Sequence, residues 1–577
     1  MKKLGADIKG FGLLLMGVIV MLCSCRDELY SIPSSQTEGT RRNLVISLTV
    51  QQPGVQSPVS RNPFKPDEEN GEYELGFTQA ECQINTLTLI MMGVYNGEEL
   101  FETWQTIELD TPVFGSYDVT FTLSGITGTK HFYILANADP KQHIAAFWAK
   151  DRIFDAGEDE SGHNIVGSLM DVDHEDDGKG SNILMAGIVK SNSGDRDIVI
   201  PTGDGNEETV EKITIDTPIN LVRTVAKVLL TCVPKSDAEE YVKVIDAKDA
   251  ETNPERDGEN TGWIKLAEVN YMLNVLNRKT YLDYREDTKD DGYLIDPNYE
   301  MSNWIEKRTN DNETTYGIKD LDAYQKEFLY YDTQAMVEML NTSIPTYQRG
   351  EPCMVRTATL YNKNRIGKEN ATSDHYTEGL YCTENTVYND MRFDKDADFQ
   401  SAIRYVTTRV MVGAKYTPKV IWNGGDKPKT AQTEKEAQGI LDDKVEDVDN
   451  PLEPVTYPEG TFWRDSEGNY YSRAGMIKKL QDAPETEFSR YDGGWGYYYT
   501  YIDENAQNGA ISKDTQTRWG IKRNHYYILK VDKIIAPGSP FPGNETMRIH
   551  SELVDWVNKG GSEVEIKVPQ QSETAQP

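Results

Sequence analysis

Two cysteines close the apolar stretch at the N-terminus of this chain, and the chemistry they suggest is acylation of a thiol. They stand in Leu22-Cys23-Ser24-Cys25, after a basic start that contains Lys2, Lys3 and Lys9. As a helix, the apolar residues 11–22 would rise only about 18 Å against about 30 Å of membrane hydrocarbon, so they are typical of a cleaved signal peptide. Ser24 supplies the small residue needed before the cut, and we therefore predict lipidation at Cys25.

Residues that could act in catalysis are few. The chain has only seven histidines, and it contains no glycine-rich phosphate loop, no HExxH zinc helix and no GxSxG turn. His375 and Cys382 are a conceivable base and nucleophile, but their spacing in a tyrosine-rich strand region is a weak pattern. We expect an exposed histidine and a half-buried cysteine there. The chain is therefore predicted to have no catalytic residues, no cofactor and no enzymatic activity.

Two acidic segments resemble the start of a calcium-binding loop. In residues 173–178 oxygen-bearing side chains alternate before a glycine, but Leu184 stands where the bidentate carboxylate should be. In residues 287–292, Lys289 places a cation among the ligands. We expect solvated acidic turns and assign no metal ligands; irregular calcium binding by these loops is left open.

The composition excludes some partners and indicates the fold class. Lys and Arg number 60 against 94 Asp and Glu, and the net charge of −34 repels nucleic acid and anionic lipid surfaces. We expect no nucleic-acid partner, and membrane contact only through the lipid of the precursor. Short segments rich in Val, Ile, Thr and Tyr, separated by turn residues, indicate an all-β fold.

Beyond Cys25, only four cysteines are spread along the chain, at Cys82, Cys232, Cys353 and Cys382. Three pairings are possible, and so few bridges are not the main framework of a chain of 577 residues. Whether these thiols form disulfides or stay free and buried is left open.

Alternation predicts a first strand at residues 43–50, with one face formed by Leu44, Ile46, Leu48 and Val50. Residues 51–63 are rich in Pro, Gly, Ser and Gln, and they predict an exposed, protease-accessible linker around Arg61. Further strands are expected at 85–95, 116–123, 130–137 and 182–189. Helices are expected at 141–150 and, from the apolar spacing, over 324–341.

The C-terminal end also alternates. Val564, Ile566 and Val568 face one way, against Glu563, Glu565 and Lys567, after an apolar stretch that holds Leu553 and Val557. This pattern predicts a short amphipathic strand at a free end of the chain.

The stretch 523–538 reads RNHYYILKVDKIIAPG and combines a basic start with an aromatic strand. It resembles the aromatic strand near the end of the Bacteroidales fimbrillins, the subunits of type V pili. Asp27 and Glu28 resemble the acidic surface-export signals of Bacteroidota lipoproteins. Other similar segments follow the family order, at 94–97, 134–137, 380–385 (LYCTEN), 409–418 and 462–471. The chain length resembles that of the minor, short fimbria subunit more than the major type.

The resemblance implies a fold of two transthyretin-like or Greek-key β-sandwich domains with long loops and a few short helices. It also implies a lipidated precursor that an arginine-specific surface protease cuts. Cleavage at Arg41 or Arg42 would leave the first strand attached, whereas cleavage between Arg61 and Asn62 would remove lipid and strand together, and we expect the latter. Loss of the first strand would expose an apolar groove, and another subunit's C-terminal strand would then fill it, a form of β-augmentation.

We therefore expect five parts: a signal peptide with lipobox (1–25), a propeptide with the first strand (26–61), an N-terminal β-sandwich (62–212), a C-terminal β-sandwich (213–545) and a donor-strand tail (546–577). The expected partners are other copies of this subunit, fimbrial tip and anchor subunits, the protease, and host or bacterial surface receptors. The precursor would be anchored by lipid at the outer membrane, and the mature chain would lie in a fimbria on the cell surface.

Two alternatives stay open. One is a fimbrial tip or anchor subunit. The other is a surface lipoprotein that does not polymerise and binds glycans or host proteins, with Trp495, Tyr497 and Tyr498 as an aromatic platform.

Replacing the predicted lipid acceptor tests the export prediction. Cys25→Ala should abolish labelling of the precursor by a radioactive fatty acid, because no other thiol follows a small residue at the end of the apolar stretch. Cys23→Ala, two residues earlier, should label like the wild type. Labelling that persists in Cys25→Ala would contradict the assignment.

Overall fold

A computed structural model of the chain describes residues 41–51 and most of 83–555. The longer ranges outside the described residues are 1–40, 52–82, 156–169, 172–181, 203–209, 233–240, 247–260, 342–354, 361–378, 443–456, 503–517, 543–549 and 556–577. The described residues form two compact units. Unit 1 takes its residues from 41–51, 84–154 and 185–221, and unit 2 comprises the others.

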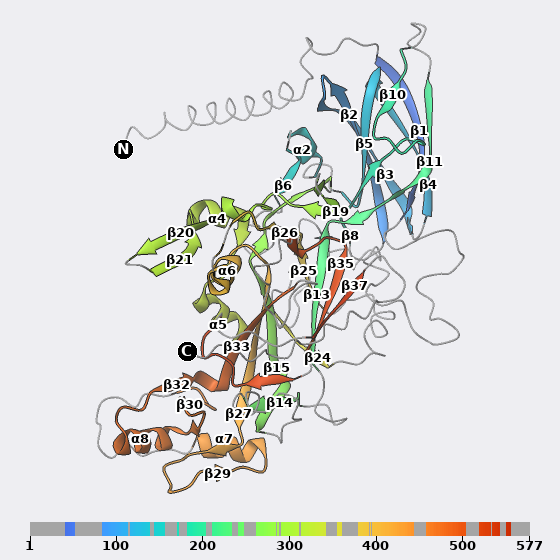
Figure 1. The fold of residues 1–577 in the computed structure, drawn as a ribbon. Coiled ribbons are helices and arrows are strands. Elements are labelled where there is room, and N and C mark those ends of the chain that lie inside the picture. The colour runs from blue at the N-terminus through green and yellow to red at the C-terminus, as the bar shows by residue number, and fades with distance from the viewer. Residues whose placement is uncertain are drawn as a thin grey trace, which may run out of the picture. The chain divides into compact units, whose positions relative to one another are not determined.

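Unit 1 contains two sheets (Figure 1). The first has the order β11-β1-β4, with the bounds Glu211–Asn220, Arg41–Gln51 and Ser116–Ile126. The second contains the order β9-β5-β2-β3, with β10 also paired to β5; the bounds are Met185–Val189, Gly128–Ala136, Ile84–Tyr95, Glu98–Val113 and Ile198–Ile200. The domain boundary expected after residue 212 stays a prediction; unit 1 runs to Leu221 and includes the whole of β11.

Local sequence explains most strands of unit 1. The strands predicted at 43–50, 85–95, 116–123 and 130–137 are observed as β1, β2, β4 and β5. Asn96 and Gly97, with φ of 52° and 84°, make the two-residue turn from β2 to β3, a conformation that these two residues adopt readily. The sequence did not predict β3, a long strand at the sheet edge whose side chains are mostly half-buried.

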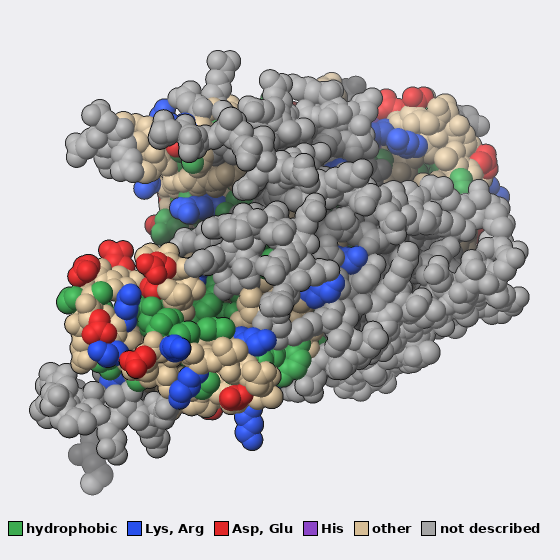
Figure 2. Space-filling view, turned by 60° about the horizontal axis from the view of Figure 1, so that its bottom comes forward, with side chains coloured by type: hydrophobic (Ala, Val, Ile, Leu, Met, Phe, Trp, Pro, Cys, Tyr) green, Lys and Arg blue, Asp and Glu red, His purple; other side chains and the backbone are tan. Residues whose placement is uncertain are grey.

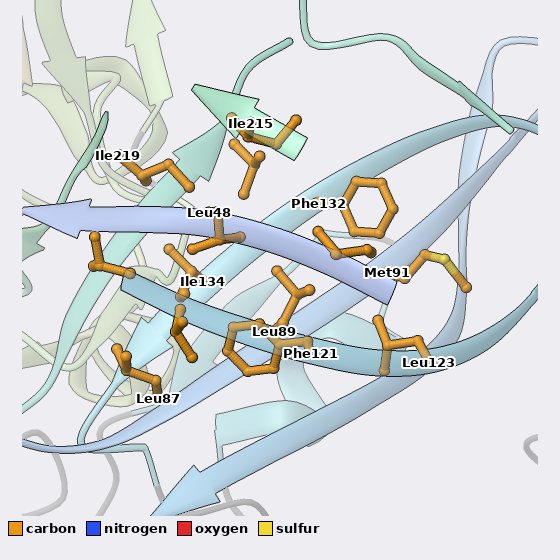
Figure 3. Packing of buried hydrophobic residues seen from close by; sticks show 14 of the residues in the cluster. Leu48, Leu87, Leu89, Met91, Phe121, Leu123, Phe132, Ile134, Ile215 and Ile219 are labelled. Carbon is orange, nitrogen blue, oxygen red and sulfur yellow. The ribbon is translucent and has the colours of Figure 1, made fainter. Parts of the chain in front are cut away.

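The core of unit 1 lies between its two sheets. Side chains from β1, β4 and β11 pack there against those of β2, β5 and β9. Figure 3 shows Leu48 of β1 among Ile134, Ile215 and Ile219, with Phe121 and Leu89 further along the strand. The strand β1 therefore contributes to the middle of the core and not to its margin.

Unit 2 is built on two further sheets. One has the order β24-β13-β35-β37, with β25 also paired to β13, and the other has the order β23-β15-β27-β33. Every residue of β13 is buried, as expected for a strand covered on both faces. The bounds are Thr359–Leu360, Val225–Cys232, His525–Val531, His550–Asp555 and Leu380–Thr383 in the first sheet, and Val355–Thr357, Gly262–Asn274, Arg409–Pro418 and Trp495–Tyr501 in the second.

A small subdomain is inserted between β27 and β33. Its core is aromatic: Phe462 stacks on Tyr491 at 4.8 Å and packs edge-on against Tyr416 and Tyr470. Figure 2 brings forward the end where α7 and α8 lie, and Lys and Arg are interspersed there with Asp and Glu among hydrophobic side chains. Its elements are β28 (Val420–Ile421), β29 (Lys429–Thr430), α7 (Glu434–Leu441), β30 (Phe462–Asp465), β31 (Tyr470–Tyr471), α8 (Arg473–Asp482) and β32 (Phe488–Tyr491).

The described helices are short, and none exceeds ten residues. One of them, α2 (His143–Trp148), lies within the expected range 141–150. The single helix suggested by the spacing over 324–341 was wrong: α4 (Leu321–Glu327) and α5 (Thr333–Asn341) are separated by β22 (Phe328–Leu329), which pairs with β16 (Leu276–Asn277). Buried Phe328 satisfies the helical spacing but belongs to a strand.

The predicted all-β class with a few short helices is confirmed. The remaining described elements are α6 (Asp396–Ile403), η3 (Met301–Asn303), η5 (Asp492–Gly494), β6 (Ile153–Asp155), β7 (Met170–Asp171), β8 (Asn182–Ile183), β12 (Val222–Arg223), β14 (Val244–Asp246), β17 (Lys279–Tyr281), β18 (Arg285–Asp287), β19 (Asp290–Ile295), β20 (Ile305–Asn310), β21 (Glu313–Ile318), β26 (Asn385–Tyr388), β34 (Arg518–Ile521) and β36 (Ile534–Ala536).

Candidate functional site

The strand β1 occupies the centre of its sheet, with a paired neighbour on each side. It runs antiparallel to β4, from Arg41 opposite Ile126 to Gln51 opposite Ser116. It runs parallel to β11 from Leu44 onward, with a bulge between Leu48 and Val50. Its main-chain donors and acceptors are thus used on both edges, and its removal would leave both neighbouring strands unpaired.

The inward face of β1 fills the core. Leu44, Ile46, Leu48 and Val50 are each at most 3% exposed. On β4 they lie opposite Leu123, Phe121, Val119 and Tyr117, and the facing sheet covers them with residues that include Leu87, Leu89, Met91, Phe132 and Ile134. We call the space that these neighbours enclose the β1 groove. Burial of four such side chains corresponds to roughly 6 to 12 kcal/mol of gross hydrophobic free energy.

The outward face of β1 is polar. Thr49 donates a hydrogen bond to Asp118 at 2.6 Å, and the Ser47 hydroxyl lies 3.1 Å from that of Thr120. Such exposed contacts add little to stability compared with the apolar face. The position and register of β1 are therefore determined by its alternating side chains and by its main-chain pairing.

The candidate cleavage residues differ in accessibility. Arg41 and Arg42 belong to β1 and are paired with Ile126 and Gly125 of β4, and Arg42 is buried. A protease must bind its substrate as an extended free segment, so the folded strand protects both bonds. Arg61 and Asn62, like the lipidation residue Cys25, lie outside the described residues.

The predicted donor tail is described only at its start. Leu553 lies in β37, opposite Tyr527 of β35, so this part of the tail forms an edge strand of the chain's own sheet. Val557, Val564, Ile566 and Val568 lie outside the described residues. A donor that included Leu553 would first have to give up the pairing between β37 and β35.

Two motifs far apart in the sequence meet in the core of unit 2. The Arg523 guanidinium contacts Glu384 through Nε at 3.0 Å and Nη2 at 2.9 Å, and both side chains are fully buried. Nη2 also donates to Thr280 and to the carbonyl of Tyr281. Arg523 opens the RNH motif (523–525), and Glu384 opens the sequence Glu384-Asn385-Thr386, here called the ENT motif. Their opposite charges were the signal in the sequence that could have predicted this ion pair.

The other residues of these motifs hold the surrounding chain. Asn524 donates its main-chain N–H to the Val225 carbonyl, and its side-chain oxygen accepts from Arg223. Asn385 donates to Val275, and Thr386 donates to Asp296 through both its main-chain N–H and its hydroxyl. A buried network of this kind stabilises one arrangement of strands because each broken contact would leave a polar group buried without a partner.

Asp296 is the titrating member of this network. Burial raises the pKa of Asp296 to about 7, and the nearby Glu384 carboxylate adds to the effect. Hydrogen bonds from Thr386 and Asn298 oppose it. At neutral pH the fold of unit 2 therefore holds a carboxyl group near its titration point.

Other predicted sites are ordinary core residues. Tyr497 and Tyr498 are buried and donate to Asn341 and to the Ile535 carbonyl, so they offer no open aromatic platform. Cys382 is fully buried and not half-buried as expected, and burial raises the pKa of its thiol well above the usual range. Cys232 is also a buried free thiol, whereas Cys82, Cys353 and His375 lie outside the described residues.

Metal and membrane features can be stated for the described part of the chain. No group of three or more His, Cys, Asp or Glu side chains in it is placed to hold a metal ion. Of the acidic segments, Asp287 belongs to β18 and residues 290–292 to β19, which pair with each other, whereas 288–289 and 173–178 lie outside the described residues. Among the described residues, no helix combines the length and the apolar character needed to cross a membrane.

Comparison with known proteins confirms the resemblance to fimbrillins. Residues 489–575 match the family described as "Major fimbrial subunit protein type IV, Fimbrillin, C-terminal". This segment contains β33, the RNH motif and β37. No curated protein matches the chain in sequence.

Solved structures are similar to this chain at low sequence identity. A putative cell adhesion protein from Parabacteroides distasonis is 13% identical, with 90% of this chain and 99% of that one covered, at a TM-score of 0.37. A fimbrilin from Porphyromonas gingivalis is 13% identical, with 89% and 98% covered, also at 0.37. The tip fimbrial protein of the same organism, with a C-terminal truncation, is 10% identical, with 89% and 100% covered, at 0.27.

Replacing Asp296 should change how the stability of unit 2 depends on pH. With the folded-state pKa near 7 and an unfolded value near 4, the folded state holds one more proton between these limits. The contribution of Asp296 to the free energy of unfolding therefore falls as pH rises from 4 to 7, by on the order of a few kcal/mol. Asp296→Asn should remove this dependence of the free energy of unfolding on pH. The measurement is urea unfolding at several pH values, followed by the hydrogen exchange of main-chain amides in β26.

The matched control is Asp322→Asn, an exposed carboxylate in α4, which should leave the slope unchanged. An equal slope in Asp296→Asn and the wild type would contradict the role given to Asp296.

Proposed function

We propose that this chain, whose C-terminal residues match the fimbrillin family, is a structural subunit of a cell-surface fimbria that polymerises by donor-strand exchange. The observation that carries the proposal is the position of β1, which is central in its sheet and inward-facing in the core. A chain that loses such a strand gains a groove with two unpaired edges and an apolar floor. Another extended strand can fill that groove by β-augmentation.

The strand can be removed by one cut. In the proposed pathway the precursor is lipidated at Cys25, reaches the outer membrane surface, and is cleaved between Arg61 and Asn62 by an arginine-specific protease. The burial and pairing of Arg42 support this site over the two arginines in β1. The cut separates the lipid and β1 from the rest of the chain.

The donor is proposed to be the C-terminal tail of a second subunit. Val564, Ile566 and Val568 alternate as Leu44, Ile46 and Leu48 do, and residues 556–577 follow β37, the last strand among the described residues. The free energy gained by burying three or four side chains must exceed the entropic cost of ordering the tail. Main-chain pairing on both edges of the inserted strand adds to the gain. The resulting fibre would carry tip and anchor subunits and support adhesion to host or bacterial receptors.

The N-terminus of the mature subunit tests the processing step. Protein sheared from cells should begin Asn62-Pro63-Phe64, and Arg61→Ala should retain β1 and the lipid. Arg41→Ala should be processed like the wild type. A mature N-terminus at Asn43 or Leu44 would contradict the proposal, because β1 would then stay attached.

Truncation of the tail tests donation. A chain without residues 556–577 keeps β37, so unit 2 should fold and be processed, accept a donor and end a fibre. Purified protein cut after Arg61 should form oligomer ladders that resist mild denaturant, and the truncated chain should not.

A matched pair of tail variants makes the test specific. The triple replacement of Val564, Ile566 and Val568 by serine should abolish the ladders, whereas Glu563→Gln with Glu565→Gln on the other face should preserve them. Ladders of normal length from the truncated chain would show that another surface holds the polymer.

A further inference from the structure

The inward face of β1 has a fifth position, and it is charged. Arg42 precedes Leu44 by two residues, so its side chain points to the same face. It is 3% exposed, although a buried guanidinium is costly unless a carboxylate compensates it. Its neighbour Arg41 points to the opposite face and is exposed.

The β1 groove is acidic at the end that receives Arg42. Glu211, the first residue of β11, lies 3.8 Å from Arg42 Nη1, with its side chain 30% exposed. Gly125 of β4 is the register partner of Arg42, and a Cβ at Gly125 would lie 3.4 Å from Glu102 Oε2. Glu102 is itself 3% exposed and is paired with Lys130. Because Lys130 already compensates Glu102, Glu211 is the carboxylate at this end that a cation on the inserted strand compensates.

The opposite end of the groove is apolar. Val50 lies between Tyr117 of β4 and Ile219 of β11, and it is fully buried. The groove thus has a polarity along its length. A strand that enters in the direction of β1 meets the acidic end with its N-terminal part and the apolar end with its C-terminal part.

On the basis of the proposed strand exchange, we infer that the β1 groove selects a donor strand with a basic residue two positions before its alternating apolar residues. Loss of Arg42 leaves Glu211 without this cation, and a basic residue on the donor restores the pair. A neutral residue leaves the carboxylate to water, and an acidic residue adds repulsion at a partly buried site. The basic residue also fixes direction and register. A shift by two residues would move it to the position of Leu44, opposite Leu123, where the surroundings are apolar.

The tail of this chain lacks that residue. Ser562 precedes Val564 by two positions, and Gln570 follows Val568 by two, so neither direction supplies a cation. The tightest partner is therefore the donor strand of a different fimbrial subunit that carries the basic residue. A second copy of this chain fits the apolar positions but leaves the acidic end unmatched.

Peptide competition on the processed subunit tests the inference. Full-length protein cut after Arg61 is incubated with a labelled peptide of residues 41–51, and unlabelled variants compete for the groove. Arg42→Ala should weaken competition about 5- to 30-fold, and Arg42→Glu more, whereas Arg41→Ala should stay within about twofold. In a tail peptide of residues 556–577, Ser562→Arg should compete better than the native sequence. Equal competition by Arg42→Ala and Arg41→Ala would overturn the inference.

A cycle in the uncut chain keeps the inference testable if no peptide enters. Arg42→Ala, Glu211→Gln and their combination are compared by hydrogen exchange in β4, where a coupling of about fivefold or more in the opening equilibrium is expected. Independent effects of the two substitutions would show that Arg42 and Glu211 do not interact and would reject the role of this pair in setting the register of the strand. Failure of every peptide, including the native 41–51 peptide, would instead count against strand exchange itself.

Discussion

The structure of unit 1 depends on one strand that supplies pairing to two neighbours and side chains to the core at the same time. Because β1 lies between β4 and β11, neither of these strands has another partner within their sheet of three. Its four apolar side chains pack against side chains of the facing sheet. A replacement must therefore satisfy the same main-chain edges and the same alternation, which restricts the occupants of the groove to extended strands.

The two units are stabilised in different ways. The core of unit 1 between its sheets is apolar, and the four inward side chains of β1 that enter it are defined by alternation. Unit 2 instead contains a buried network around Arg523 and Glu384, in which each partner depends on several others. Breaking one member would leave a buried charge uncompensated, so the network opposes rearrangement of the strands that it joins.

Folding also decides which arginines a protease can reach. Arg41, Arg42 and Arg61 are equivalent as isolated side chains, but the first two are part of a strand paired on both edges. The same inward position places the Arg42 guanidinium 3.8 Å from Glu211. One structural fact, the inward position of a single residue, therefore underlies both the proposed choice of cleavage site and the proposed selection of the donor strand.

The sequence by itself determined the features that depend on local pattern. Alternation placed β1, because a strand with one buried face repeats every two residues, and short segments rich in Val, Ile, Thr and Tyr between turn residues placed β2, β4 and β5. The apolar length and Ser24 predicted a signal peptide with lipidation at Cys25, and the motif order indicated the fimbrillin resemblance. Only tertiary structure decided that β1 is central and that β11 pairs beside it, because strand order depends on contacts between residues more than 150 positions apart in sequence. For the same reason the burial of Arg42, the ion pair of Arg523 with Glu384 and the strand at Phe328 could not be read from local spacing.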